Sequence, residues 1–215
     1  MLRTHRFLAL LSAIAACSSF GVAAETSAPA TLEIGAHTPH ALVIKDMRWA
    51  ETAGGAAIHW VTAASAADFA ILRAEEALAR RAAGEALKAV FVVSRQAGDY
   101  RLLVVREDFL ASRPEMVERV VGLYERARRW LVTHPLETAT LFAQETGASA
   151  AAAQAILAGR EFHVSRPGPA LALALRASAD AARSRQVDAL LDDGPMRAAT
   201  RKLTRGQQLL LLSQR

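Results

Sequence analysis

The feature that most constrains the fold is a run of closely spaced elements between residues 102 and 164. A short apolar stretch, 102–105, is typical of a buried strand, and a long amphipathic segment begins at Pro114. Its apolar side chains recur at helical spacing: Val117, Val120, Val121, Tyr124 and Leu131. The opposite face carries charged side chains: Glu118, Arg119, Glu125, Arg126 and Arg129. The segment is therefore predicted to be one long helix with a single buried face.

Proline, glycine and serine divide the rest of this region into short helices. Pro135 suits a first helical turn but not a helix interior, so a second helix is predicted to begin there. Gly147 is a typical residue just after a helix end, and Ser149 can cap a third helix over 150–157. The predicted order is a strand, a short helix, the long helix and two further helices, with very short connections.

The N-terminal part alternates between strands and helices. Strands are predicted over 32–35 and 57–61, with a helix opening at 41–47 between them. A second helix is predicted to contain Phe69, Ile71 and Leu72. This βαβα order favours a parallel sheet.

The middle and end of the chain add a hairpin and more helix. One charged, alanine-rich helix is predicted over 75–88, and strand 90–93 is predicted to pair with 100–105. Residues 168–185 are predicted to form one helix. The basic tail, 197–215, either lies on a membrane surface as an amphipathic helix or is a frayed end.

Several motifs in the 102–164 region keep a regular spacing. They consist of Arg106, Asp108 and Phe109; Pro114, Glu115 and Val117; Trp130; His134, Pro135, Glu137 and Ala139; and Glu145, Thr146 and Gly147. In this order they resemble the C-terminal part of periplasmic substrate-binding proteins of the sulfonate/nitrate/taurine ABC-transporter family. Shorter matches to the same family occur at 32–35, 57–61 and 187–192. The alternative is an unrelated helical bundle with ordinary helix caps.

The resemblance implies an α/β fold of the periplasmic-binding-protein-like type II. Family members have two lobes around a ligand cleft, and this chain lacks the long middle section that completes the first lobe and builds most of the second. The expected fold is therefore incomplete, with a short parallel or mixed sheet and a C-terminal helical cluster. The predicted parts are a signal peptide at 1–24, a flexible lead-in at 25–31, an N-terminal part at 32–88, a C-terminal part at 89–194 and a basic tail at 195–215.

The first residues have the pattern of an export signal. Arg3 and Arg6 precede an apolar run, 7–16, that is short for a membrane span. Cleavage after the small residues 22–24 and lipidation of Cys17 in a lipobox are both open, as is an uncleaved anchor. Each alternative predicts a protein body outside the cytoplasm, either free in the periplasm or held at a membrane.

Composition argues against several functions. Cys17 is the only cysteine, so the body has no disulfide, thiolate metal site or catalytic thiol. The net charge of +5 is spread evenly and does not favour nucleic acid. His37 and His40 lack a third metal ligand nearby, and the chain has no nucleophile elbow or phosphate-binding glycine loop. We expect no metal, no cofactor and no enzymatic activity.

The resemblance also implies where a ligand would bind. His37 and Thr38 match the family's first binding loop, Ser65 matches the second, and Tyr100 lies where the family places cleft residues. Backbone N–H groups at helix N-termini, helped by hydroxyl groups, suit a small anion. Thr38 and Ser65 could equally be ordinary helix caps.

The implied function is an extracytoplasmic solute-binding component that delivers a sulfonate-like anion to an ABC permease in the inner membrane. A nitrate or thiamine-precursor ligand remains open. The alternative function is that of a truncated family remnant, a structural or interaction protein of the cell envelope without ligand binding.

Overall fold

The centre of the molecule is one mixed sheet. The computed structural model describes residues 30–33, 38–52, 58–61 and 67–213. The sheet has five strands in the order β2-β1-β3-β5-β4. They are β1 (Ala30–Glu33), β2 (Ile58–Val61), β3 (Phe69–Arg73), β4 (Leu87–Gln96) and β5 (Asp99–Arg106). β1 runs parallel to β2 and β3, whereas β5 runs antiparallel to β3 and β4. The predicted α/β fold with a short mixed sheet is confirmed.

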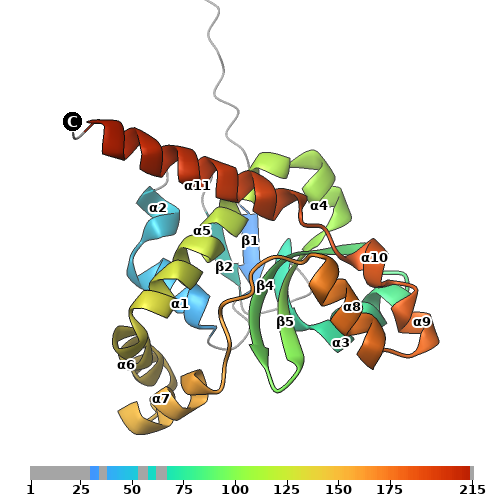
Figure 1. Cartoon of the computed structure of the whole chain (residues 1–215), viewed down its shortest axis with the longest axis horizontal. Helices are drawn as coiled ribbons and strands as arrows, with labels where there is room; N and C mark the ends of the chain where they lie inside the picture. Colours follow the sequence, from blue (N-terminus) through green and yellow to red (C-terminus); the bar gives the residue numbers. More distant parts are fainter. Residues whose placement is uncertain (1–29, 34–37, 53–57, 62–66, 214–215) are drawn as a thin grey trace, which may run out of the picture.

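Helices cover both faces of the sheet (Figure 1). They are α1 (Pro39–Asp46), α2 (Trp49–Thr52), α3 (Ala74–Ala82), α4 (Glu107–Ser112), α5 (Pro114–Thr133), α6 (Pro135–Thr146), α7 (Ala150–Ala158), α8 (Pro169–Ser178), α9 (Ala181–Ser184), α10 (Val187–Leu190) and α11 (Gly194–Ser213). One core cluster joins the sheet to α1, α5 and α11. The other joins its opposite face to α3, α8 and α10.

The alternation of side chains along β5 explains these two cores. Leu103 and Val105 point into the α5 side, and Leu102 and Val104 point into the opposite side. All four are at most 1% exposed. Burial of each such side chain contributes roughly 1.5–3 kcal/mol, so a continuous apolar run suits a strand covered on both faces.

The long predicted helix is present as α5, with one correction to its polar face. Val117, Val120, Val121, Tyr124 and Leu131 are buried as expected. Glu125, which was assigned to the exposed face, is only 3% exposed. It accepts hydrogen bonds from Arg128 at 2.6 Å and from Arg129 at 2.9 Å. The helical period alone placed Glu125 wrongly, because paired carboxylates can be buried.

The predicted helix boundaries after α5 are confirmed. Gly147 follows α6 with a φ of 69°, a left-handed conformation that glycine adopts without strain. The Ser149 hydroxyl accepts a hydrogen bond from the Ala152 backbone N–H at 3.2 Å and caps α7. These local signals are sufficient to define the short connections.

Three predicted helices are wrong in extent or type. The segment with Phe69, Ile71 and Leu72 is strand β3, because a short apolar run fits either structure until a neighbouring strand pairs with it. The helix predicted over 75–88 ends at Ala82, and Leu87 already belongs to β4. The helix predicted over 168–185 is split in two. Asp180 accepts a hydrogen bond from the Arg183 N–H and caps the separate helix α9.

The C-terminal tail forms α11, which crosses α5 and extends beyond the body of the molecule (Figure 1). Met196 and Ala199 are buried against the core, and Lys202 forms an ion pair with Glu118 at 2.5 Å. Among the described residues, no helix has the length and hydropathy of a membrane span.

Candidate functional site

The structure describes only part of the predicted ligand set. His37 and Ser65 lie outside the described residues, as does Cys17. Thr38 precedes α1 and is 4% exposed. Among the described residues its hydroxyl has no hydrogen-bond partner, and it does not cap the helix. Thr38 is therefore a buried residue with an unused donor at the start of α1, and its proposed contact with a ligand stays a prediction.

Thr38 and Tyr100 belong to the same edge of the sheet. This edge is formed by the carboxyl ends of β1 and β3 and by the beginning of the antiparallel strand β5. α3 begins directly after β3, and α1 begins six residues after the end of β1. Open α/β sheets bind ligands outside the carboxyl ends of their parallel strands, so this edge is the candidate functional edge.

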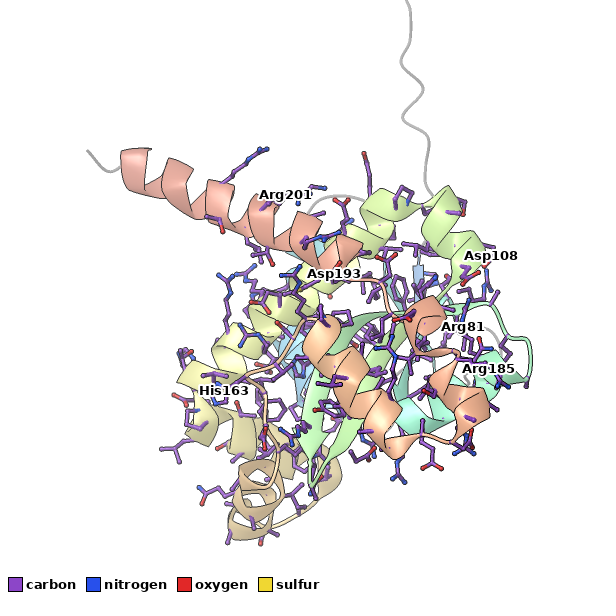
Figure 2. All side chains as sticks on the ribbon, turned by 45° about the vertical axis from the view of Figure 1, so that its right-hand side comes forward. Arg81, Asp108, His163, Arg185, Asp193 and Arg201 are labelled. Atoms are coloured by element: carbon purple, nitrogen blue, oxygen red, sulfur yellow. The ribbon has the colours of Figure 1, made fainter. Side chains whose placement is uncertain are left out.

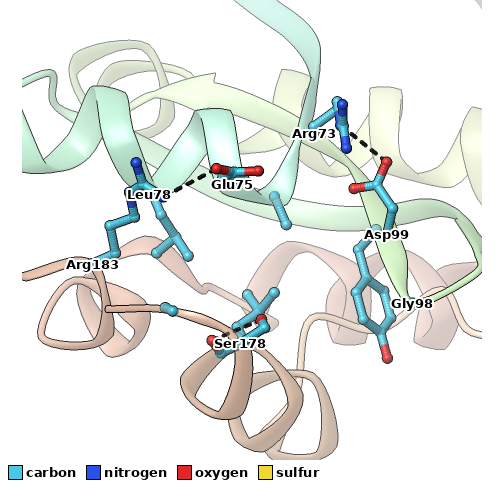
Figure 3. A pocket seen from close by; sticks show the side chains of 11 residues that line it. Arg73, Glu75, Leu78, Gly98, Asp99, Ser178 and Arg183 are labelled. Atoms are coloured by element: carbon cyan, nitrogen blue, oxygen red, sulfur yellow. Dashed lines mark hydrogen bonds and ion pairs between the residues drawn. The ribbon is translucent and has the colours of Figure 1, made fainter. Parts of the chain in front are cut away.

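Tyr100 lines a polar pocket of about 300 Å³ at this edge (Figure 3). Two arginines also line it, and each has a carboxylate partner. Arg73 pairs with Asp99 at 3.0 Å, and Arg183 pairs with Glu75 at 3.1 Å. The pocket is thus balanced in charge, which gives an anion little electrostatic reason to enter.

The segment after α7 joins the hairpin tip to the start of α1. Backbone hydrogen bonds connect Glu161 with Arg95 of β4 in both directions, at 2.7 and 3.0 Å. The Phe162 ring lies 5.6 Å from the ring of His40 in α1. Residues 160–162 therefore lie between two parts of the candidate edge.

Two unpaired cations accompany this segment. Arg101 in β5 is exposed and, by strand alternation, points to the same face of the sheet as Leu103. Arg160 is half-buried, with its guanidinium 5.8 Å from the Phe142 ring. Within the described residues neither forms an ion pair or a side-chain hydrogen bond. Burial, together with the positive charge of Arg101, lowers the pKa of Arg160.

Arg160 also lines an apolar pocket of about 350 Å³ between α5, α6 and α7. Other residues of its wall are Leu131, Val132, Leu136, Leu157, Phe162 and His163. Figure 2 labels His163 at this position. Leu136 is 66% exposed and forms an open part of this wall. The Arg160 pocket thus joins a cation to an apolar wall.

His40 contributes packing to this region. It is fully buried, and its ring stacks on Tyr124 at 5.8 Å. Burial, followed by the positive charge of Arg128, lowers the pKa of His40 to about 3. His40 is therefore neutral at ordinary pH and does not offer a charge to a ligand. Among the described residues there is no group of three His, Cys, Asp or Glu side chains placed for a metal ion.

Sequence reasoning missed Arg101 and Arg160. Each has acidic residues nearby in the chain, and the spacing gives no indication that the two cations stay unpaired. Only the pairing of Glu161 with Arg95, which holds the segment after α7 against the β4–β5 hairpin, brings them to one edge of the sheet.

Two solved structures have the same fold. The alkanesulfonate-binding protein SsuA from Xanthomonas axonopodis pv. citri, bound to MOPS, matches with a TM-score of 0.59 and 12% identity, over 72% of this chain and 91% of that chain. The periplasmic aliphatic sulphonate binding protein SsuA from Escherichia coli matches with a TM-score of 0.59 and 9% identity, over 75% and 86%. No protein-family model matches the chain, and no curated protein matches it in sequence. The chain therefore has the fold of the periplasmic sulfonate-binding proteins, as its sequence motifs predicted.

Proposed function

We propose that this protein is an extracytoplasmic, non-enzymatic binding protein for a small organic anion with an apolar tail, such as an alkanesulfonate. The fold likeness to two sulfonate-binding proteins supports a solute-binding role. The predicted export signal and the periplasmic location of the Escherichia coli protein support a periplasmic location. Delivery of the ligand to an ABC permease and lipid anchoring at Cys17 belong to the same proposal.

The observation that carries the proposal is the unpaired Arg160 beside an apolar pocket. Arg160 is a half-buried cation that has lost hydration, and within the described residues it meets the Phe142 ring but no carboxylate. An anionic headgroup on its guanidinium would restore this interaction through charge-assisted hydrogen bonds. The nearby charge of Arg101 strengthens the attraction.

The apolar wall gives the proposal its ligand class. An alkyl chain attached to the headgroup would cover Leu131, Val132 and Leu136. Burial of one methylene group contributes about 0.8 kcal/mol, so affinity should rise with chain length. Nitrate and taurine, which offer little or no apolar surface, should bind more weakly than hexanesulfonate.

The loops after β1 and β2 complete the proposed site. His37 and Thr38 would add donors from the first loop, and Ser65 from the second. Thr38 directly precedes the N-terminus of α1, which suits an anion, whereas Ser65 precedes strand β3 and would contribute its hydroxyl. Tyr100 would take part from the neighbouring pocket, where Arg95 lies 5.6 Å from its ring.

A second candidate function is supported by the single sheet. All strands in the described residues belong to it, whereas the sequence resemblance implies two lobes that close on the ligand. A site on a single lobe would leave part of a ligand exposed to water. For the binding protein proposed above we therefore expect millimolar rather than micromolar affinity. If no ligand binds, the protein would act as an interaction module of the envelope.

A thermal-shift series tests both candidates. The chain from Glu25 onward keeps every described element and is melted with hexanesulfonate, propanesulfonate, taurine and nitrate. At ten times the dissociation constant a ligand stabilises by about 1.4 kcal/mol, which is about 3–6 °C for a protein of this size. We expect the concentration needed for this shift to be lowest for hexanesulfonate.

Two arginine variants complete the test. Arg160→Gln should abolish the shift, and the control Arg185→Gln, in the exposed connection between α9 and α10, should retain it. If the protein melts cooperatively but no anion changes its melting temperature, the interaction module is favoured. An equal shift in the Arg160→Gln protein would refute the Arg160 pocket as the site.

A further inference from the structure

A second surface, between α2, α5 and α11, combines tryptophan side chains with basic side chains. An open groove of about 700 Å³ runs between α2, α5 and α11. We call it the tryptophan groove. Its walls carry two indole rings and three cations: Trp49, Trp130, Arg126, Arg129 and Lys202.

The cations of the groove differ in their partners. Arg129 pairs with Glu125 at 2.9 Å, and Lys202 pairs with Glu118 at 2.5 Å. The Arg126 guanidinium lies 4.0 Å from the centre of the Trp49 ring. Within the described residues it has no carboxylate partner, so its charge is available to an anion from outside.

The positive surface continues along α11. This helix, 194–213, contains four basic residues and no Asp or Glu: Arg197, Arg201, Lys202 and Arg205. Met196 and Ala199 occupy its buried face, and helical spacing places Arg201 and Arg205 together on the exposed face. Figure 2 shows Arg201 on α11. Within the part of the chain that the structure describes, Arg201 and Arg205 form no ion pair.

The shape of the tryptophan groove argues against an enclosed small-molecule site. Binding pockets for small ligands cover most of the ligand surface, whereas this groove is open along its length. Indole rings flanked by Lys and Arg are typical of groups that meet a lipid headgroup layer. A basic helix without acidic residues is attracted to anionic lipid over distances of about 10 Å.

We propose that the tryptophan groove and the exposed basic face of α11 dock the protein on an anionic phospholipid bilayer. Arg126, Arg201 and Arg205 contact lipid phosphates, and the exposed edges of Trp49 and Trp130, whose rings are otherwise half-buried against the core, face the headgroup layer. This contact would leave the Arg160 pocket, which lies between α5, α6 and α7, open to solution. The inference stands independently of the ligand proposed above.

Vesicle co-sedimentation tests the proposal. The chain from Glu25 onward is mixed with vesicles of phosphatidylcholine alone or with phosphatidylglycerol added. We expect binding only to the anionic vesicles, with an affinity that falls steeply as salt is raised. Arg201→Gln/Arg205→Gln should weaken binding by roughly thirty-fold, since each cation near an anionic surface contributes separately.

A charge-matched control and a shortened chain decide the interpretation. Arg176→Gln/Arg185→Gln also removes two positive charges, but from α8 and the connection after α9, and should bind like the unaltered protein. A chain that ends at Gly206 keeps every groove residue and should still bind anionic vesicles. Equal weakening by both arginine pairs would overturn the proposal. Binding that depends only on residues 207–215 would do the same.

Discussion

At the scale of single residues, burial without a partner distinguishes His40. Its side chain is fully buried among Phe91, Tyr124 and Phe162, and neither ring nitrogen has a hydrogen-bond partner in the described structure. Its pKa is lowered from 6.5 to about 3, chiefly by burial. His40 therefore folds in the neutral form, which links the stability of the protein to pH.

The sign of this linkage follows from where the proton binds. Between pH 6.5 and about 3 the unfolded chain binds a proton at His40 that the folded chain does not, so acid favours unfolding. From pH 7 to pH 5 this residue alone should remove about 2 kcal/mol from the free energy of unfolding.

Urea unfolding of the His40→Phe protein at pH 7 and pH 5 tests this prediction. The loss on acidification should be smaller by about 2 kcal/mol than in the unaltered protein. At pH 7 the free energy of unfolding of the variant should lie within about 1–2 kcal/mol of that of the unaltered protein. The substitution removes an unsatisfied polar group but inserts a larger ring. The exposed-histidine control His59→Gln should keep the full pH dependence. If the His40→Phe protein loses as much stability between pH 7 and pH 5 as the unaltered protein, His40 is not the source of the pH dependence.

At the scale of elements, a tight turn closes the β4–β5 hairpin. Ala97 and Gly98 form its tip with φ values of 47° and 83°. Two positive φ angles in succession define a type I′ turn, in which Asn-Gly is the preferred pair. Ala97 is thus an unusual residue in a strained position, and the turn is held by strand pairing on both sides.

Substitutions at the two turn positions should change the free energy of unfolding in opposite directions. Ala97→Asn should raise the free energy of unfolding by about 0.5–1 kcal/mol, because asparagine tolerates the left-handed region better. Gly98→Ala should lower it by about 1–2 kcal/mol, since a Cβ at a φ of 83° is strained even where space is open. Thermal melts followed by circular dichroism give both values. Stabilisation by Gly98→Ala would mean that the turn has a different backbone geometry.

At the scale of the whole molecule, the two core clusters share the same strands. β3, β4 and β5 contribute buried side chains to both, so neither cluster can lose its strands without exposing the other. The helical cluster α8–α10 is connected to the sheet through the bridge between Leu191 and Ala89. The predicted N-terminal and C-terminal parts therefore meet in one sheet, and we propose that they form a single cooperative unit.

This unit should unfold in one transition. Near-UV and far-UV circular dichroism should give the same urea midpoint, because tertiary packing and secondary structure are lost together. A second transition at lower urea would show that α8–α10 and α11 unfold before the sheet. That result would contradict a single cooperative unit.

The sequence by itself determined the local structure and the family likeness of the fold. Helical periodicity defined α5, and Pro135, Gly147 and Ser149 fixed the ends of its neighbours, because helix signals act within a few residues. Motif spacing around Phe109 predicted the periplasmic-binding-protein-like fold, which the structural comparison supports.

Only the tertiary structure decided how distant residues are paired. The stretch 69–73 became a strand because β5 pairs with it, and Glu125 could be buried because Arg128 and Arg129 face it. Arg101, Arg126 and Arg160 form no ion pair within the described residues, because there the fold brings no carboxylate to face them. Ion pairing depends on distances of a few ångströms between segments far apart in the chain, and no local pattern of residues specifies those distances.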